Sequence, residues 1–377
     1  MAADDDAMLK AKFVLTLNAG SSSLKFALFS RERPEHAVFA DSIEGATDRS
    51  LDFVLDKVAT IMDVDGLAAV GHRIVHGGPQ LSAPQFVSAE VIAELKRLVP
   101  FAPEHLPAEI ALIEAFGARF PQVVQVACFD TAFHRDMLRV AQLLPIPHRY
   151  AAAGVRRYGF HGLSYEFLRD ELVRLRDPAA TTGRVILAHL GSGASLAAMT
   201  NGKCVDTSMG FTPSAGLMMG TRSGDLDPGL LTYLAREMSA TQLDHLVNHE
   251  SGLLGVSETS ADMRELLRLE PGDLRAADAI ALFCQQTKKW IGSFAAVMDG
   301  LDTLVFAGGI GEHSAVVRAR ICSGLGFLGL QLDASRNAAN GSVISSESSR
   351  VSVRVMHTNE ELVIARAVNR LLQPTIE

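Results

Sequence analysis

The sequence predicts an α/β protein built from two related halves. Short apolar runs alternate with segments of helical period, and two stretches share one pattern. FVLTLNAGSSSLKFALF starts at Phe13 and VILAHLGSGASLAAM at Val185; each is a strand, a small-residue loop and a returning apolar segment, with the second loop one residue longer. The repeat favours a duplicated architecture with a cleft between the halves. Gly/Ser hairpins are common, so coincidence stays open as the alternative.

Apolar runs rich in β-branched residues mark the strands, and longer stretches with a helical period mark the helices. Ser88 and Ser164 occupy N-cap positions, and Asp227 is a cap followed by proline at the first helical position. The predicted strands are Phe13–Leu17, Phe26–Phe29, Leu67–Val75, Val123–Phe129, Val185–Leu190, Thr303–Ala307 and Val351–Met356. The predicted helices are Ser88–Leu98, Ser164–Leu175, Pro228–Glu237, Leu274–Met298 and Glu360–Leu372.

Composition limits the class of protein. The 377 residues suggest two or three domains, 48 % of them are hydrophobic, and the net charge is −8. An acidic surface argues against nucleic acid or an anionic membrane as partner, because both select Lys/Arg clusters. Residues 1–11 carry three aspartates, the opposite of a signal peptide, and are predicted to be a disordered tail. Four widely spaced cysteines fit reduced thiols in a cytoplasmic protein: Cys128, Cys204, Cys284 and Cys322.

Three glycine-rich turns follow predicted strands and suit phosphate binding. They are Asn18–Ser23, Gly191–Ser195 and Gly308–Glu312. Glycine lets backbone N–H groups approach phosphate closely, and serine adds further donors. None of the turns matches a P-loop or a GxGxxG motif that opens a helix. Three such turns in one chain, with Lys25 just after the first, favour a nucleotide ligand.

Two arginines and two carboxylates stand out from the acidic background. Arg73 and Arg222 lie in glycine-flanked loops, where a guanidinium suits bidentate binding of carboxylate or phosphoryl oxygens; a structural ion pair is the alternative for either. Asp130 ends a buried strand, where open α/β sheets place ligands, with a helix N-cap as its alternative. Glu360 opens a predicted helix, where Thr358 and Glu361 would form a capping box instead.

The ordered motifs resemble the acetate kinase family from about residue 13 to 366. They are FVLTLNAGSSSLKF, VGHRIVHGG, FDTAFH, RRYGFHGLSY, HLGSGASL, MGTRSGDLDPG, SGLLGVS, AGGIGEHS and HTNEELVIAR. The resemblance implies two duplicated ribonuclease-H-like domains of the actin/Hsp70/sugar-kinase type, flanking a nucleotide cleft, and a homodimer. The first domain would be 12–131 plus 360–377, and the nucleotide-binding domain 132–359.

The resemblance also implies roles, motif by motif. Arg73 and Arg222 would grip the carboxylate and the transferring phosphoryl group, His161 would donate to that group, and Asp130 would be the essential carboxylate. Mg²⁺, or Mn²⁺ in its place, would be organised by Asn18 and Glu360. The small acyl pocket would be lined by Val75, Phe160 and Pro213. The ATP contacts would be Lys25, Ser21, His189, Leu190, Gly191, Ser192, Gly193, Asp262, Met263, Arg264, Gly309, Ile310, Gly311, Glu312 and His313.

The implied function is reversible phosphorylation of acetate by ATP, giving acetyl phosphate through direct in-line transfer. Ser192 and His313 depart from the asparagines usual in the family, which leaves ATP against GTP open. A propionate- or butyrate-preferring kinase is the alternative within the same chemistry. A different class, an ATP-hydrolysing conformational switch, would have no use for two arginines beside an acyl pocket. A catalytically silent relative is disfavoured because every proposed catalytic group is present.

Overall fold

The computed structural model describes residues 12–20, 23–44, 50–62 and 66–373; the predicted N-terminal tail, 1–11, lies outside them. The chain divides into two compact units. The first comprises Met1–Arg135, Gly162–Phe167 and Asn359–Glu377, and the second Asp136–His161 and Leu168–Thr358. The predicted domain limits stay a prediction. No helix in the described ranges has both the length and the apolar character needed to cross a membrane.

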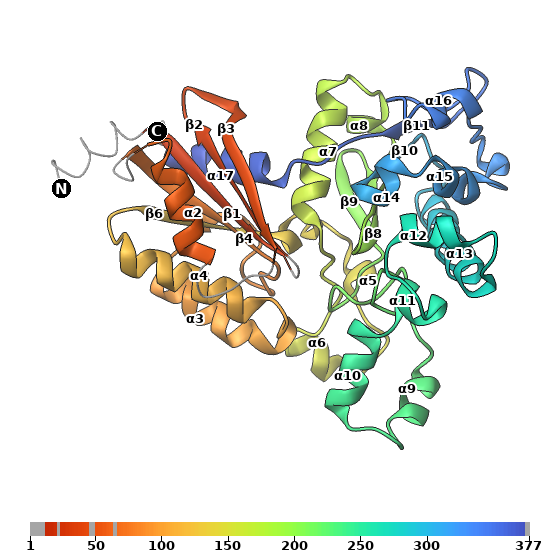
Figure 1. Cartoon of the computed structure of the whole chain (residues 1–377), viewed down its shortest axis with the longest axis horizontal. Helices are drawn as coiled ribbons and strands as arrows, with labels where there is room; N and C mark the ends of the chain where they lie inside the picture. The colour runs from red at the N-terminus through yellow and green to blue at the C-terminus, as the bar shows by residue number, and fades with distance from the viewer. Residues whose placement is uncertain (1–11, 21–22, 45–49, 63–65, 374–377) are drawn as a thin grey trace. The chain divides into compact units, whose positions relative to one another are not determined.

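The first unit contains a six-stranded mixed sheet in the order β3-β2-β1-β4-β6-β5 (Figure 1). β1, β2 and β3 form an antiparallel meander, whereas β4 and β6 extend the sheet parallel to β1. The parallel strands end at one edge of the sheet, where ligands bind in open α/β folds. The strands are β1 Phe13–Ala19, β2 Ser23–Ser30, β3 Arg33–Glu44, β4 Leu67–Ile74, β5 Gln85–Phe86 and β6 Val124–Phe129.

Alternating side chains of these strands fill two separate cores. Val14 and Phe29 pack with the apolar face of α17, whereas Leu15 and Leu28 pack with residues of α2 and with Phe116 of α4. This is the period of two that places neighbouring side chains on opposite faces of a sheet. The helical segments of this unit are α2 Ser50–Ala59, α3 Ala89–Leu98, η2 Val99–Phe101, α4 Leu106–Arg119, η3 Asp130–His134 and α17 Glu360–Leu372, together with the start of α7 Gly162–Arg174.

The second unit contains a five-stranded sheet in the order β11-β10-β7-β8-β9 (Figure 1). β7, β8 and β9 form the antiparallel meander, and β10 and β11 run parallel to β7. Five strands of the first sheet repeat this arrangement, with β1 in the place of β7, so the predicted duplication is visible in the strand order. The strands are β7 Arg184–Leu190, β8 Ala194–Thr200, β9 Lys203–Thr207, β10 Thr303–Ala307 and β11 Ser352–Val355.

The predicted loop lengths were wrong. Four positions separate the paired ends Ala19 and Leu24 of the first hairpin, and three separate Leu190 and Ala194 of the second. The second loop is therefore the shorter one, because its strands pair right up to the glycines.

Helices surround the second sheet. The longest is α13, which buries Ile280, Phe283, Thr287, Ile291 and Phe294 along one stripe, the spacing of a helix with one core-facing side. The helical segments are α5 Arg139–Gln142, α6 His148–Ala152, the rest of α7, α8 Ala179–Thr182, α9 Pro228–Leu234, α10 Ala240–His249, α11 Gly252–Ser257, α12 Met263–Leu269, α13 Leu274–Val297, α14 Gly308–His313, α15 Ala315–Cys322, η4 Gly326–Leu328 and α16 Ala334–Ala338.

Two of the predicted helix caps are confirmed. Ser88 accepts a hydrogen bond from the Val91 amide at the start of α3, and Asp227 accepts one from the Leu230 amide at the start of α9. Ser164 is not a cap, because α7 begins earlier, after His161. The capping box of Thr358 and Glu361 is also wrong: α17 is capped by Asn359. Glu361 is therefore left to contact another partner.

Candidate active site

The first unit places an arginine–aspartate pair at the ligand-binding edge of its sheet. Arg73 lies near the end of β4 and Asp130 directly follows β6. Arg73 Nε donates to Asp130 Oδ1 at 3.2 Å, Nη2 donates to Oδ2 at 2.7 Å, and Nη1 donates to the Ala19 carbonyl at 2.7 Å. Asp130 is fully buried and does not cap η3, so the alternative N-cap interpretation is wrong. A guanidinium has five N–H groups, and these bonds leave two of them for another ligand.

Burial by itself would lower the pKa of Arg73. The negative charges of Asp130 and Glu360 outweigh that effect and raise the pKa of Arg73 above its ordinary value. The side chain is 11 % exposed. Arg73 is therefore permanently charged and held in one orientation, with a small part of its side chain accessible.

Asn18 and Glu360 meet at the same edge. Asn18, near the end of β1, donates through Nδ2 to Glu360 Oε2 at 2.8 Å and to Glu361 Oε1 at 3.0 Å. Ser164 donates to the other oxygen of Glu360. Asn18 is 5 % exposed, and Glu360 is half-buried. We call Asn18, Arg73, Asp130 and Glu360 the first-unit cluster.

The first-unit cluster offers oxygen donors suited to a hard cation. Mg²⁺ prefers oxygen ligands, and proteins usually hold it with one or two carboxylates plus waters and substrate phosphates. The contacts of Asn18 use its nitrogen and leave Oδ1 able to face an ion beside Glu360. In the described ranges, no three His, Cys, Asp or Glu side chains are arranged to hold a metal alone. The donor set thus fits a magnesium ion that takes its remaining ligands from water and from the phosphates of a substrate.

The first glycine-rich turn is described only in part. Ser21, a predicted ATP contact, lies outside the described residues. Lys25 pairs with Asn18 across the β1–β2 hairpin, and its side chain is exposed. Lys25 lines a shallow cavity together with Asn359 and Glu361, at the N-terminus of α17. This position leaves its ammonium group accessible to a phosphate.

The second unit places His161 beside the β7–β8 turn. His161 has a left-handed backbone, with φ of 57°, at the N-terminus of α7. Its Nδ1 lies 2.9 Å from Ser195 Oγ, and its ring stacks on His189 with centroids 4.4 Å apart. A Cβ at Gly193 would lie 3.3 Å from His161 Nε2, so glycine is needed there for the close approach. Ser195, His189 and the nearby Gly193 backbone therefore restrict the position of the His161 ring.

Arg222 reaches the same turn from a different loop. The same Cβ at Gly193 would lie 3.8 Å from Arg222 Nη1. That nitrogen also donates to the Pro213 carbonyl at 3.2 Å. The loop is tied to the turn by the Gly220 amide, which donates to the Ser192 carbonyl at 2.9 Å. We call His161, Gly193, Ser195 and Arg222 the second-unit cluster.

The second and third glycine-rich turns adjoin within the second unit. Gly308 has φ of 75°, and a Cβ there would lie 2.7 Å from the Leu190 carbonyl oxygen. A Cβ at Gly309 would meet nothing within 4 Å, so this backbone faces open space. Residues 308–313 form helix α14 rather than a turn, and Glu312 accepts from the Gly308 amide at 3.0 Å. Ile310 and Gly311 belong to that helix, and His313 at its end is exposed.

The other residues predicted to contact ATP or the acyl group differ in exposure and in the unit to which they belong. Asp262 caps α12 by accepting from the Arg264 amide and also pairs with the Arg264 guanidinium at 2.6 Å, while Met263 is buried core. These two charges satisfy each other at the surface. Val75 is 2 % exposed in the first unit, Phe160 is 1 % exposed in the second, and Pro213 is half-buried.

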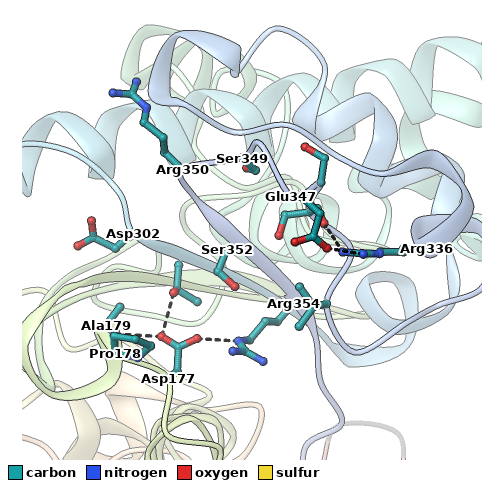
Figure 2. A pocket seen from close by; sticks show the side chains of 14 residues that line it. Asp177, Pro178, Ala179, Asp302, Arg336, Glu347, Ser349, Arg350, Ser352 and Arg354 are labelled. Atoms are coloured by element: carbon teal, nitrogen blue, oxygen red, sulfur yellow. Dashed lines mark hydrogen bonds and ion pairs between the residues drawn. The ribbon is translucent and has the colours of Figure 1, made fainter.

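A separate cavity of about 440 Å³ lies in the second unit, away from every predicted site residue (Figure 2). It is found where β10 and β11 begin, next to Thr303 and Ser352, the end of the sheet opposite to Gly308. Figure 2 shows two of its three arginines paired with carboxylates: Arg354 donates to Asp177 at 2.7 Å and Arg336 donates to Glu347. We assign no ligand to it.

Three polar residues of these clusters were not predicted. Ser195 contacts His161, Ser164 contacts Glu360, and Glu361 contacts Asn18. The signal for Ser195 was its register, because it pairs with His189 across the predicted hairpin. Ser164 was predicted as a helix cap, and that pattern did not indicate its contact with Glu360.

The comparisons with known proteins fit this architecture. The model of the Acetokinase family matches residues 40–366. An acetate kinase from Rhodopseudomonas palustris (strain TIE-1) is 42 % identical, covering 95 % of this chain and 98 % of that protein. A propionate kinase from Escherichia fergusonii is 40 % identical, covering 96 % and 97 %. The crystal structure of Porphyromonas gingivalis acetate kinase superposes with a TM-score of 0.87 at 36 % identity, covering 96 % of this chain and all of that one.

Fold and sequence together therefore define an ATP-dependent kinase whose phosphoryl acceptor is a carboxyl group. The chain belongs to the acetokinase family. The predicted α/β class with two related sheets is confirmed, and so is the resemblance on which the predicted roles depend.

Proposed function

We propose that this kinase phosphorylates acetate, reversibly, forming acetyl phosphate and ADP. The observation that carries the proposal is the Arg73–Asp130 pair. Asp130 fixes the guanidinium in one orientation while two of its N–H groups stay unused. A bidentate fork of this kind matches a carboxylate, and the buried Val75 two residues away offers an apolar surface to the acyl group.

The reaction needs orientation more than acid–base catalysis. A carboxylate is already a nucleophile at neutral pH, so it attacks the γ-phosphorus while the bond to the ADP oxygen breaks. Charge then spreads over three equatorial oxygens in a loose transition state. Arg222 and His161 would donate to those oxygens, and Arg73 would hold the acid in line. Asp130 acts through Arg73 by holding its guanidinium.

The metal is part of the proposal. Asn18 and Glu360 would organise Mg²⁺, or Mn²⁺ in its place, because the Asn18 amide holds the Glu360 carboxylate at the first-unit edge and both side chains carry oxygens that a hard cation prefers. When bound, the ion would neutralise charge on the nucleotide phosphates. Ser164 and Glu361 would keep Asn18 and Glu360 oriented.

The nucleotide contacts are proposed from the open glycine segments. The Gly309 backbone faces open space, so its N–H group can approach a phosphate, and Lys25 adds an accessible charge. The Gly191 amide donates to the Gly193 carbonyl at 3.0 Å, so Gly191 and Gly193 are proposed from the position of their turn next to Gly309. Asp262 and Arg264 pair with each other, so adenine or ribose would have to compete with that ion pair or bind to its backbone. The assay below compares ATP with GTP to determine which nucleotide the enzyme prefers.

The acyl chain length is the finer part of the proposal. Relatives of comparable identity are named acetate kinase and propionate kinase, so sequence similarity does not separate the two acids. The almost fully buried Val75 favours a two-carbon acid. One methylene is worth only about 1–3 kcal/mol, so propionate should be used at a reduced rate rather than refused.

A homodimer and a cytoplasmic location complete the proposal. Helix α9 exposes Leu230 at 41 % and Tyr233 at 56 %, an apolar surface that a second copy would cover. All four cysteines are buried free thiols, which fits a reducing compartment. Light scattering of the purified chain, with Leu230→Ser and Tyr233→Ser introduced together, tests the dimer surface.

The decisive experiment is a steady-state assay of acyl phosphate, trapped as its hydroxamate. It compares acetate, propionate and butyrate, with ATP and with GTP, in the presence and absence of Mg²⁺. We expect the highest kcat/KM for acetate and no turnover without a divalent cation. A higher kcat/KM for propionate or butyrate would reassign the substrate. Nucleotide consumed without acyl phosphate would overturn the proposal in favour of a conformational switch.

A further inference from the structure

A carboxyl group lies buried behind the proposed acid-binding residues. Glu109 projects from α4 and is only 3 % exposed. Its two oxygens lie 3.0 and 3.3 Å from the backbone nitrogen of Val75, which donates to them. Val75 is the first residue beyond β4, where the sheet no longer supplies acceptors. Glu109 takes the place of that missing acceptor.

Side chains accept hydrogen bonds from three of the backbone amides that follow Arg73. Glu109 accepts from Val75, Thr131 accepts from the Gly77 amide at 3.1 Å, and His76 Nδ1 accepts from the Gly78 amide at 2.9 Å. Thr131 is adjacent to Asp130, so the arginine's partner and this turn are fixed by one segment. The position of Val75, and of the strand end that carries Arg73, therefore depends on Glu109.

Glu109 is also coupled electrostatically to the first-unit cluster. Burial raises the pKa of Glu109 to about 8, against the attraction of Arg73 and the hydrogen bond from Val75, with the Asp130 charge adding to the rise. At pH 7 the side chain is therefore a neutral acid. Above pH 8 it becomes an anion that competes with a bound carboxylate for the field of Arg73.

Several other charged groups near α4 are neutral in that range or paired. On β4, burial lowers the pKa of His72 to about 4, so that ring is neutral. Helix α3 contributes Lys96, which pairs with Glu114 at 2.7 Å, and α2 contributes Asp52, which pairs with Arg119. His105 stands at the N-cap position of α4, and His76 follows Val75 and accepts from the Gly78 amide. The charges that shift the pKa of Glu109 are those of Arg73 and Asp130.

We propose that Glu109 is a positioning residue of the acid-binding site: it holds the Val75 amide, and its deprotonation weakens binding of the carboxylate substrate. The inference depends on the proposed function, because it acts through Arg73. It predicts that the KM for the acid rises at alkaline pH. This rise would come from a group of the protein, because a short-chain acid is already fully ionised from pH 6.5 upward.

The experiment measures kcat and the KM for acetate from pH 6.5 to 9.5 in four proteins. They are the wild type, Glu109→Gln, Glu109→Leu and the control Glu114→Gln, which removes an exposed carboxylate from the same helix. In the wild type and the control we expect KM to rise about five-fold above pH 8 while kcat changes little. Glutamine keeps an oxygen for Val75 but cannot ionise, so its KM should stay low and flat. Leucine removes the acceptor and should raise KM at every pH.

Infrared spectroscopy supplies a readout that does not depend on turnover. The wild-type protein should show a protonated-carboxyl C=O band that disappears near pH 8 and is missing in Glu109→Gln. An alkaline rise of KM that persists unchanged in Glu109→Gln, or no such band, would overturn the inference while leaving the kinase intact. If the wild type forms no acyl phosphate, the proposed function fails instead. If Glu109→Leu does not fold, the glutamine variant still decides.

Discussion

The two sheets share one strand order but differ in what they carry at corresponding ends. At the edge of the first sheet, Asn18 and Asp130 are buried and Arg73 and Glu360 are half-buried, and ion pairs and hydrogen bonds join them. At the edge of the second sheet, glycines dominate, and Gly309 faces open space. His161 lies beside Gly193 and contacts the Ser195 hydroxyl, and Arg222 donates to the Pro213 carbonyl.

This difference assigns different tasks to equivalent places in a duplicated scaffold. A small rigid anion is best held by charges that the fold has already oriented, because little ordering remains to be done when it binds. A polyphosphate is larger and needs backbone that can come close to it, which glycine permits. We therefore expect the first-unit arginine, Arg73, to support folding as well as binding, and the second-unit arginine, Arg222, to serve mainly turnover.

Removing the first-unit arginine tests the folding half of this contrast. Arg73→Ala leaves Asp130 fully buried without its counter-ion, and breaking a buried pair in this way costs about 3–5 kcal/mol of stability. Urea unfolding should show the loss. A variant that unfolds at the wild-type urea concentration would mean that Asp130 finds another partner and that the first-unit cluster is not structural.

Removing the second-unit arginine tests the other half. Arg222→Ala should lower kcat by 10²–10³, about 3–4 kcal/mol of transition-state stabilisation, with near-wild-type unfolding. Arg222 is only half-buried and its Nη1 donates to the neutral Pro213 carbonyl, so we expect a smaller loss of stability than from breaking the buried Arg73–Asp130 pair. Near-normal kcat, or a destabilisation as large as that of Arg73→Ala, would remove the distinction between the units.

The buried Glu109 predicts a pH dependence of stability confined to the first unit. Its folded pKa of about 8 lies above the unfolded value of about 4.3, so the folded chain holds this proton more tightly. The stability it contributes is present in full at low pH, falls as the pH rises, and is gone above about 8. From pH 5 to 8 the wild type should lose on the order of 3 kcal/mol relative to Glu109→Gln. Urea unfolding at several pH values measures this; parallel curves for the two proteins would contradict it.

The sequence located the buried parts of the fold and missed the exposed ones. The central strands β1, β4, β7 and β10 read as apolar runs, because both of their faces are covered. β3 was missed: it pairs only with β2, and most of its side chains are exposed, so no apolar alternation marks it. Helix α4 was missed because His105, at its N-cap position, makes no side-chain cap and the buried Glu109 interrupts its apolar face.

The residues of the candidate site likewise differ in how well the sequence predicts them. Arg73 and Asp130 were predictable as charges at the ends of buried strands, but their pairing joins residues 57 positions apart and depends on the parallel register of β4 with β6. No sequence pattern indicated the buried position of Glu109, because a glutamate among leucines and alanines suggests a solvated helix face. The tertiary fold, rather than any local pattern, brings that carboxyl to the Val75 amide.

The smallest effect comes from adding one methyl group to the second-unit cluster. Gly193→Ala should lower kcat about ten-fold, near 1.4 kcal/mol, because the new Cβ presses on His161 Nε2 at 3.3 Å. The ring cannot move away freely, since Ser195 holds its other nitrogen and His189 stacks on its face. Gly272→Ala is the matched control, because a Cβ there meets nothing within 4 Å. Equal kcat values for the two variants would show that the position of His161 does not matter for turnover, and the second-unit cluster would then have to act through Arg222 alone.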